Sequence, residues 1–494
     1  MARPGAIFPY VIGFVLAVPI FFHVGPQGIT MGESVISGLR TPGIDLPLSA
    51  FAIIPIFALL LMKGRQSIRV DMADFLVIAY LCINFLSYFL GNLFSCCLNE
   101  KSIFLSTGFL FQSVLPLLAY LTARLLPGSR NGTDIGTSQF IFLERILISA
   151  ALTLAVSIFL LALQTRITGE YDFRFGPFVD HIGPFMITKI KRYYPTLLSV
   201  AAIILVSYGF DSGLSAAKRW FRLLAGVLAM ACLMGMWSRA ALLTLGSGII
   251  FLMLLSTFRG FRGVSLPALT LSCAVAIAFI LLIPVLPSLG LTSVTRLIDS
   301  IGGEGLLLVG DINRARALGE ALEVGLLRPL GEMYQPVLTY SLGGLNYDFT
   351  RLRLAEHGYL DVAVRAGPIA MFAVLALIGR ILWLGLTTAN HLGPAPGFPQ
   401  TFSRQGLKGL IAALLSIFLV SNQMQQNLTE PYAAIFVWFF LGLLLTVSQL
   451  YREQHGNRAM VGGDLGHADP AGRPGAPAVE ERQRRPGHQA GAEG

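Results

Sequence analysis

Ala355-Glu356-His357-Gly358-Tyr359-Leu360 closes the longest polar stretch of this chain, Ser288–Glu356, and opens the apolar segment 358–387. The polar stretch carries six Arg, no Lys and eight acidic residues. The rest of the chain consists mostly of apolar runs of about 20 residues, the length at which a helix crosses a lipid bilayer. Because backbone groups in lipid must be hydrogen-bonded internally, these runs predict an all-α polytopic membrane protein.

The composition agrees with this class and argues against a soluble enzyme. Of the 494 residues, 54% are hydrophobic and 13% are charged, and the mean hydropathy is +0.68. The formal net charge of +9 comes mostly from basic residues in short loops between apolar runs. Such a distribution reports membrane topology, so we expect no nucleic-acid partner.

Twelve apolar segments can be drawn, and each is predicted to be a membrane-spanning helix. They lie at about 6–23, 44–62, 72–94, 102–126, 139–163, 193–210, 220–237, 239–257, 264–287, 358–387, 407–424 and 431–451. The first is interpreted as a retained span, because no small-residue cleavage site follows it. Residues 1–451 thus form one transmembrane domain. Residues 452–494 are rich in Gly, Pro, Ala, Glu and Arg and are predicted to be a disordered tail.

The predicted orientation rests on the Lys and Arg residues of alternate loops. One set of loops holds Lys63, Arg65, Arg69, Arg124, Arg130, Lys218, Arg219, Arg222, Arg259, Arg262, Arg404 and Lys408. The other short loops hold only Arg40, Lys101 and Arg239. Cytoplasmic loops carry the excess of basic residues, so the first set is predicted to be cytoplasmic. Both termini then lie in the cytoplasm, and the Ser288–Glu356 segment lies outside.

One predicted outer loop, Gln164–Arg192, departs from this charge rule. Its basic residues include Arg174, Lys189 and Arg192. Positive charge on the outer side favours a role in guiding an anionic substrate. The alternative is a loop that escapes the rule because the other loops already fix the orientation. The sequence supports the two interpretations about equally.

Motifs that bind nucleotides or metals are absent from the sequence. There is no GxxxxGK[ST] phosphate loop, no HExxH, no Cys/His cluster and no Asp-x-Asp pair. We therefore expect any chemistry to use ordinary polar side chains, without ATP, a metal ion or another cofactor.

His357 is the main candidate for acid–base chemistry. If the chain around it is helical, Asp361 and Arg365 follow His357 at intervals of four residues and share its face. Arg353 precedes it by the same interval. Asp361 would then orient the imidazole as a general base, while Arg353 and Arg365 bind an anion. The alternative is a polar helix end at the level of the lipid headgroups, and spacing alone slightly favours that alternative.

Three further arginines are candidates for the same chemistry. Arg239 lies in the turn Met236-Trp237-Ser238-Arg239-Ala240, which is too short to form a loop. A charge at the edge of the bilayer is costly, so it marks either a functional residue or a side chain that reaches the headgroups. Arg314 and Arg316 are predicted to lie on a short amphipathic helix in the polar stretch. At most one of the two is expected to contact substrate, and the other to be solvated or paired.

Four short motifs occur in order between residues 238 and 370. They are Ser238-Arg239-Ala240-Ala241-Leu242, Arg314 or Arg316 ahead of Arg328-Pro329-Leu330-Gly331, His357-Gly358-Tyr359-Leu360, and Gly367-Pro368-Ile369. With twelve spans and a large late outer loop, they resemble the O-antigen ligase and polysaccharide polymerase superfamily of bacterial membrane glycosyltransferases. Gly358 replaces the usual Asn of that family, and Pro368-Ile369-Ala370 replaces the second half of a glycine turn.

The resemblance implies a metal-independent, inverting glycosyl transfer on the periplasmic side of the bacterial inner membrane. The donor would be a glycan on undecaprenyl diphosphate, and the acceptor a sugar hydroxyl. Arg239 and one of Arg314 or Arg316 would stabilise the diphosphate, because arginines bind phosphate oxygens through paired hydrogen bonds. His357 would remove the proton of the acceptor, which an imidazole of ordinary pKa can do.

Three functions remain open at this point. The first expectation is a polymerase that joins repeat units of an exopolysaccharide or O-antigen. The second is a ligase that moves finished glycan to the lipid A core. The third is a flippase or transporter for lipid-linked sugars, but no inverted repeat is apparent and the polar residues gather at the outer edge. Expected partners are membrane lipids, a flippase and a chain-length regulator.

Overall fold

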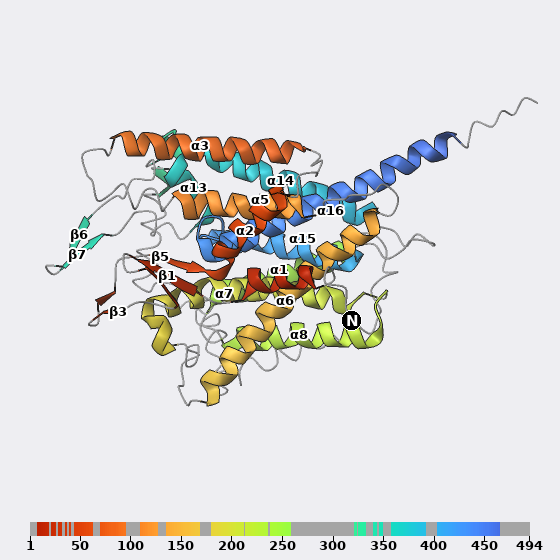
Figure 1. The fold of residues 1–494 in the computed structure, drawn as a ribbon, viewed down its shortest axis with the longest axis horizontal. Coiled ribbons are helices and arrows are strands. Elements are labelled where there is room, and N and C mark those ends of the chain that lie inside the picture. Colours follow the sequence, from red (N-terminus) through yellow and green to blue (C-terminus); the bar gives the residue numbers. More distant parts are fainter. Residues whose placement is uncertain are drawn as a thin grey trace, which may run out of the picture. The chain divides into compact units, whose positions relative to one another are not determined.

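Helices make up most of the protein in the computed structural model (Figure 1). The structure describes residues 7–18, 21–25, 28–31, 35–36, 39–40, 44–62, 70–94, 109–126, 135–167, 179–211, 213–235, 238–257, 321–323, 325–331, 339–342, 345–348, 357–391 and 403–464. They belong to two compact units, Met1–Arg452 and Glu453–Gly494. Every described helix and strand lies in the first unit, except for the C-terminal part of the last helix, α16.

The helices follow the apolar segments of the sequence. Those before the polar stretch are α1 (Phe8–Ala17), α2 (Leu48–Met62), α3 (Met72–Phe94), the π-helical turn η2 (Leu110–Val114) with α5 (Leu115–Leu125), α6 (Ile135–Ile167), α7 (Val179–Gly209), α8 (Ala216–Gly235) and α9 (Arg239–Thr257). Those after it are α13 (Gly358–Ala366), α14 (Pro368–His391), α15 (Arg404–Leu419), the short turn η7 (Ser421–Gln423) and α16 (Pro431–Asp464). Helices α3 and α9 coincide with the predicted segments 72–94 and 239–257.

Several described helices are long and apolar enough to cross a membrane. These spans are Met72–Gly91, Pro368–Ala389, Arg404–Gln423 and Ala433–Arg452. Shorter apolar helices cover Phe8–Ala17, Leu48–Met62, Tyr194–Gly209 and Ala240–Ser256. The protein is therefore helical with apolar helices suited to a membrane. The predicted segment 264–287 lies outside the described residues, so the count of twelve spans stays a prediction.

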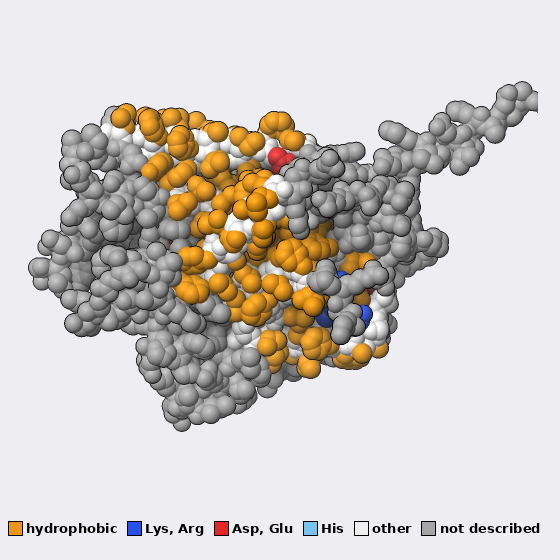
Figure 2. All heavy atoms as spheres, viewed as in Figure 1, with side chains coloured by type: hydrophobic (Ala, Val, Ile, Leu, Met, Phe, Trp, Pro, Cys, Tyr) orange, Lys and Arg blue, Asp and Glu red, His pale blue; other side chains and the backbone are white. Residues whose placement is uncertain are grey.

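The outer surface of these helices is apolar as well. Figure 2 shows hydrophobic side chains over much of the described face of the molecule. Large exposed examples are Phe75 and Phe89 of α3 and Phe372 and Trp383 of α14. A continuous apolar surface of this kind is unfavourable in water but is matched by lipid tails.

Two predicted spans end or break earlier than expected. The first was predicted to reach residue 23, but α1 ends at Ala17 and the chain turns extended at Val18 (ψ 129°). Val18 precedes Pro19, and a residue before proline avoids the helical region. The segment 358–387 is divided into α13 and α14 at Gly367, whose backbone is not helical (φ 87°).

Two other boundaries lie further out than the sequence indicated. Helix α7 begins at Val179, so Lys189 and Arg192 belong to a helix and not to an outer loop. Helix α16 continues to Asp464, so the predicted disordered tail from residue 452 starts as helix. In both cases the helix extends beyond the apolar run, at its N-terminal end in α7 and at its C-terminal end in α16, which hydropathy alone does not predict.

Short strands occupy two of the connections. After α1 the chain forms β1 (Phe21–Gly25), β2 (Gly28–Met31) and β5 (Ile44–Pro47), paired antiparallel in the order β2-β1-β5. Between them β3 (Val35–Ile36) pairs with β4 (Leu39–Arg40). Before α13, β6 (Thr339–Leu342) and β7 (Leu345–Asp348) form a hairpin. The strands supplement a predominantly helical fold.

Hydrogen bonds show which helix ends lie together at the end that carries His357. Ser87 of α3 donates to the carbonyl oxygen of Arg365 in α13 (2.9 Å), and Thr196 of α7 donates to Oε1 of Gln425 (2.6 Å). Figure 1 shows α13 and the strands β1, β5, β6 and β7 on this side of the helices. We term it the His357 end.

The opposite end is fixed by ion pairs between helices. Asp71, beside the start of α3, accepts from Nε and Nη2 of Arg380 in α14, both at 3.1 Å. Arg124 of α5 donates to both carboxylate oxygens of Asp74 (3.1 and 3.0 Å) and to the hydroxyl of Thr446 in α16. Arg124 is 5% exposed, so this predicted loop cation is a buried structural residue. We term this the Arg124 end.

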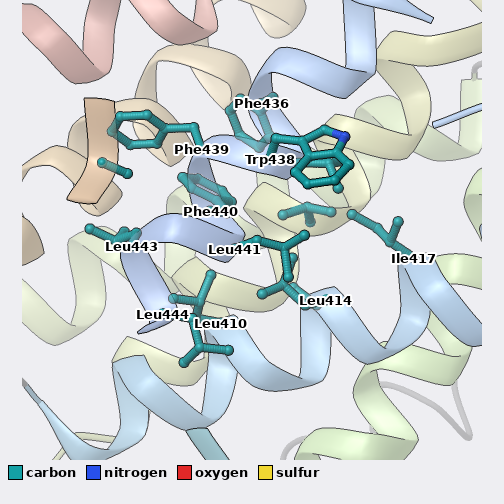
Figure 3. Packing of buried hydrophobic residues seen from close by; sticks show 14 of the residues in the cluster. Leu410, Leu414, Ile417, Phe436, Trp438, Phe439, Phe440, Leu441, Leu443 and Leu444 are labelled. Carbon is teal, nitrogen blue, oxygen red and sulfur yellow. The ribbon is translucent and has the colours of Figure 1, made fainter. Parts of the chain in front are cut away.

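The core lies around α16. Figure 3 shows Trp438, Phe439 and Phe440 among leucines of α15 and α16. Trp438 stacks on Tyr80 of α3, with ring centroids 5.6 Å apart, and its Nε1 donates to the carbonyl oxygen of Leu428 (3.0 Å). A buried indole thus has both an aromatic partner and a hydrogen-bond acceptor, as its low exposure requires.

Candidate functional site

His357 is the residue that caps the start of α13. Its backbone is extended (φ −130°, ψ 114°), and the helix begins at Gly358. Its Nδ1 accepts a hydrogen bond from the backbone N–H of Leu360 (3.3 Å). This satisfies one of the free N–H groups of the first turn, a role usually taken by Ser, Thr, Asp or Asn. The prediction that His357 shares a helical face with Asp361 and Arg365 is therefore wrong, because His357 precedes the helix. Arg353 lies outside the described residues.

The second ring nitrogen of His357 faces Gln423 in η7. Nε2 lies 2.5 Å from Oε1 of Gln423. Because the N–H of Leu360 points at Nδ1, the neutral ring carries its lone pair on Nδ1, and Nε2–H donates to Gln423. The tautomer is thus inferred from the two partners. The ring also lies against Tyr359, with centroids 5.9 Å apart.

The protonation state of His357 follows from its surroundings. Burial lowers the pKa of His357 below its ordinary value of 6.5, and the hydrogen bond to Gln423 acts in the opposite direction. A lowered pKa means that the ring is neutral at pH 7 and above. A neutral imidazole with its lone pair on Nδ1 can accept a proton there once the long bond to Leu360 is released.

Asp361 and Arg365 bind each other and do not bind His357. Nε and Nη2 of Arg365 donate to the two carboxylate oxygens of Asp361, each at 2.9 Å. Arg365 is 5% exposed and Asp361 is 0% exposed. Gln426 (3.1 Å) and the hydroxyl of Thr429 also donate to this carboxylate. The predicted contact between Asp361 and the imidazole is absent, and Arg365 is held inside the protein.

A loop of amide side chains, which the sequence reasoning overlooked, completes this end. It is the stretch 421–430 between α15 and α16, and half of its ten residues are Asn or Gln. We term it the amide loop. Gln423 contacts His357, Gln425 accepts from Thr196 of α7, and Gln426 donates to Asp361. The loop therefore connects α13 and α7 at the His357 end. In the sequence, the five amides between two apolar runs could have indicated this polar site.

The joint between α13 and α14 packs on the turn 328–331. Gly367 has φ 87° and Gly331 has φ 60°, a region that glycine adopts far more readily than other residues. A Cβ at Gly367 would overlap the carbonyl oxygen of Pro329, and a Cβ at Gly331 would overlap that of Val364. Both positions therefore require glycine for conformation and for space.

Ser87 of α3 fastens this joint. Its hydroxyl lies 3.0 Å from the carbonyl oxygen of Leu330 and 2.9 Å from that of Arg365. The motifs Arg328-Pro329-Leu330-Gly331 and Gly367-Pro368-Ile369 were identified separately in the sequence. The structure brings them into direct contact beside α13.

Arg239 is the first residue of α9, and its backbone lies at the His357 end. Ser199 of α7 donates to the carbonyl oxygen of Ala241 (2.8 Å), and α9 packs against η7. The side chain of Ser238 caps α9 by accepting from the N–H of Ala241 (3.3 Å). The side chain of Arg239 is outside what the structure describes.

The remaining predicted site residues are not placed beside His357 by the described part of the chain. Arg174, Arg314 and Arg316 lie outside the described residues. Lys189 and Arg192 are described only as backbone of α7. Among the described residues, no group of three His, Cys, Asp or Glu could hold a metal ion.

The His357 end combines a neutral imidazole with the exposed Gln423, which contacts it. Buried amides lie one and two positions from Gln423 in the sequence, at Asn422 and Gln425. Such groups can accept a proton and can bind hydroxyl groups, which both donate and accept hydrogen bonds. In comparisons with known proteins, no family model, no curated protein and no solved structure matches this chain.

Proposed function

We propose that this protein is a membrane glycosyltransferase that moves a glycan from undecaprenyl diphosphate to a sugar hydroxyl outside the bacterial inner membrane. The proposed product is a longer polysaccharide, made by joining lipid-linked repeat units of an exopolysaccharide or O-antigen. The observation that carries the proposal is the half-buried His357, hydrogen-bonded at both ring nitrogens, at the helix end where α9 begins with Arg239. The four ordered motifs and the apolar helices support it.

The proposed reaction uses the protein's own side chains. Nδ1 of His357 takes the proton from the acceptor hydroxyl as its oxygen attacks the anomeric carbon from the face opposite the diphosphate. The bond between that carbon and the diphosphate oxygen breaks, and the configuration inverts. Arg239 and one of Arg314 or Arg316 stabilise the diphosphate as its charge develops, because guanidinium groups bind two phosphate oxygens at once.

A pair of substitutions at His357 separates catalysis from helix capping. His357→Ala removes both the base and the cap, so we expect loss of activity together with about 1 kcal/mol of stability. His357→Asn removes the base but supplies a preferred capping residue, so we expect loss of activity with unchanged or higher stability.

The measurement uses purified protein and lipid-diphosphate-linked glycan extracted from a strain that lacks the protein, without ATP or an ion gradient. Polymer formation by either His357 variant at the wild-type rate would refute the assignment of the base. The lipid carrier of the deletion strain identifies the reaction. Single repeat units on the carrier indicate a lost polymerase, whereas long chains indicate a lost ligase that transfers finished glycan to the lipid A core. Turnover that requires a gradient would instead indicate a transporter.

A further inference from the structure

Asn422, in the amide loop, has a buried carboxamide without a hydrogen bond. The residue is 0% exposed, and within the described structure neither Nδ2 nor Oδ1 has a partner. The hydroxyl of Tyr359 lies near this amide, but the two groups do not meet with hydrogen-bond geometry, and the hydroxyl donates to the carbonyl oxygen of Phe418 (2.7 Å). Buried amides are nearly always paired, and an unpaired polar group costs about 1–3 kcal/mol. Asn422 therefore requires an explanation.

The position of this carboxamide is next to the proposed base. A Cβ at Gly358 would lie 2.7 Å from Oδ1 of Asn422, so the amide fills the space that a side chain at 358 would need. Gly358 directly follows His357, and Gln423, which contacts His357, directly follows Asn422. Two consecutive residues of one segment thus face two consecutive residues of the other.

The other amides of the loop have structural roles that Asn422 lacks. Gln425 is bound to Thr196, Gln426 to Asp361, and Nδ2 of Asn427 donates to the hydroxyl of Ser421 (2.8 Å). The first two contacts hold the loop against α7 and α13, and the third joins two residues of the loop. Among the described residues Oδ1 of Asn427 has no partner, but Nδ2 of that amide is bound. The carboxamide of Asn422 makes no such contact among the described residues, so holding the loop in place does not account for it.

We propose that Asn422 binds the acceptor sugar, with its carboxamide donating to and accepting from sugar hydroxyl groups beside His357. A carboxamide and a sugar hydroxyl complement each other, because each group both donates and accepts hydrogen bonds. This inference rests on the proposed glycosyl transfer and names a binding residue for its acceptor. Gly358 is part of the same arrangement, because only glycine leaves room for the amide.

The first test replaces the amide with an apolar group of similar size. Asn422→Leu is expected to leave the midpoint of thermal unfolding unchanged or higher, because no hydrogen bond is lost. It is expected to lower kcat/KM for the lipid-linked glycan by about tenfold or more, since a substrate hydroxyl loses its partner. Full activity in this variant would overturn the inference, and so would a strongly lowered unfolding midpoint.

Asn84 of α3 provides a matched control. Its amide is equally buried, but Nδ2 donates to the carbonyl oxygen of Tyr80 (2.7 Å). Asn84→Leu is therefore expected to show the reverse pattern, with a lower unfolding midpoint and unchanged activity per folded molecule. If both leucine variants lose activity in proportion to stability, the amide of Asn422 has only a structural role.

A second test moves the amide without changing Asn422. Gly358→Ala forces the carboxamide aside, so it is expected to lower kcat/KM in the wild-type protein. In an Asn422→Ala background the same change meets no amide and is expected to cost little more. Fully additive effects of the two substitutions would contradict the proposed contact. The His357→Asn variant is measured alongside. If it is inactive while Asn422→Leu is fully active, the acceptor site is wrong and the reaction stands; if it is active, the proposed function itself fails.

Discussion

Replacing Gln423 by Glu is expected to shift the pH dependence of activity upward. In the wild type, burial keeps the pKa of His357 below 6.5, so the acid limb of kcat/KM should lie below that pH. Oε1 of residue 423 lies 2.5 Å from Nε2 of the imidazole. A carboxylate there favours the charged ring, which raises the pKa. Since the base works only when its ring is neutral, activity is lost at a higher pH when the pH is lowered.

The size of the shift follows from the charge interaction. Two unit charges about 4 Å apart attract by about 4 kcal/mol near a protein surface and by about 1 kcal/mol in water. Gln423 is exposed, so a value of about 1–2 kcal/mol applies, which corresponds to about one pKa unit. The acid limb of Gln423→Glu should therefore move up by about one pH unit. High salt should reduce the shift, because the new charge is exposed.

Gln423→Leu gives the opposite sign and serves as the control. The hydrogen bond that His357 donates to Gln423 raises the pKa of His357 against the effect of burial. Its removal should lower that pKa and extend activity to lower pH. The assay is kcat/KM against pH with purified protein and lipid-linked glycan from a deletion strain. Identical acid limbs in the wild type and both variants would show that His357 is not the titrating base.

The remaining predictions concern stability, measured as thermal unfolding in detergent. Gly367→Ala should destabilise by about 1–3 kcal/mol, because φ 87° is strained for alanine, whereas Gly379→Ala, with open space around it, should be neutral or stabilising. Asp361→Asn should lower the free energy of unfolding by about 3 kcal/mol or more, because it leaves Arg365 buried without its counter-ion. An Asp361→Leu/Arg365→Met double variant should recover most of this stability. A stable but inactive double variant would return Arg365 to the list of substrate ligands. Asp74→Asn should destabilise similarly, since its arginine partner is 3% exposed at the side chain; an unchanged midpoint would contradict the buried pair.

Among the described elements, the limits of α3 and α9 were predicted best from the sequence. Helix α3 is predominantly apolar and is bounded by polar segments, so its limits follow from hydropathy alone. The break at Gly367 was not predicted, although Gly367-Pro368 was noted as a motif. A glycine–proline pair permits a break but does not require one. What fixes the break here is the carbonyl oxygen of Pro329, which lies against Gly367 from a distant part of the chain.

The candidate site was predicted only in part, for a similar reason. His357 was identified from its position ahead of an apolar segment, and its partner Gln423 was not, because the two are 66 residues apart in the chain. Asp361 and Arg365 were predicted to flank the imidazole from their spacing in steps of four. The same spacing also pairs them with each other, and burial decides in favour of that pairing, because two buried charges are tolerated only when they compensate.

The amide loop shows which question the sequence reasoning omitted. Hydropathy treats Asn and Gln between two apolar runs as an ordinary turn, which is correct when water surrounds them. In a helical bundle most of the loop at 421–430 is buried, so each of its buried amides must find a partner inside the protein. Gln425 and Gln426 have found theirs on α7 and α13. Asn422 has not, and it lies one residue from the contact with the proposed base. A count of buried amides against available partners therefore directs attention to the substrate, which the hydropathy profile could not do.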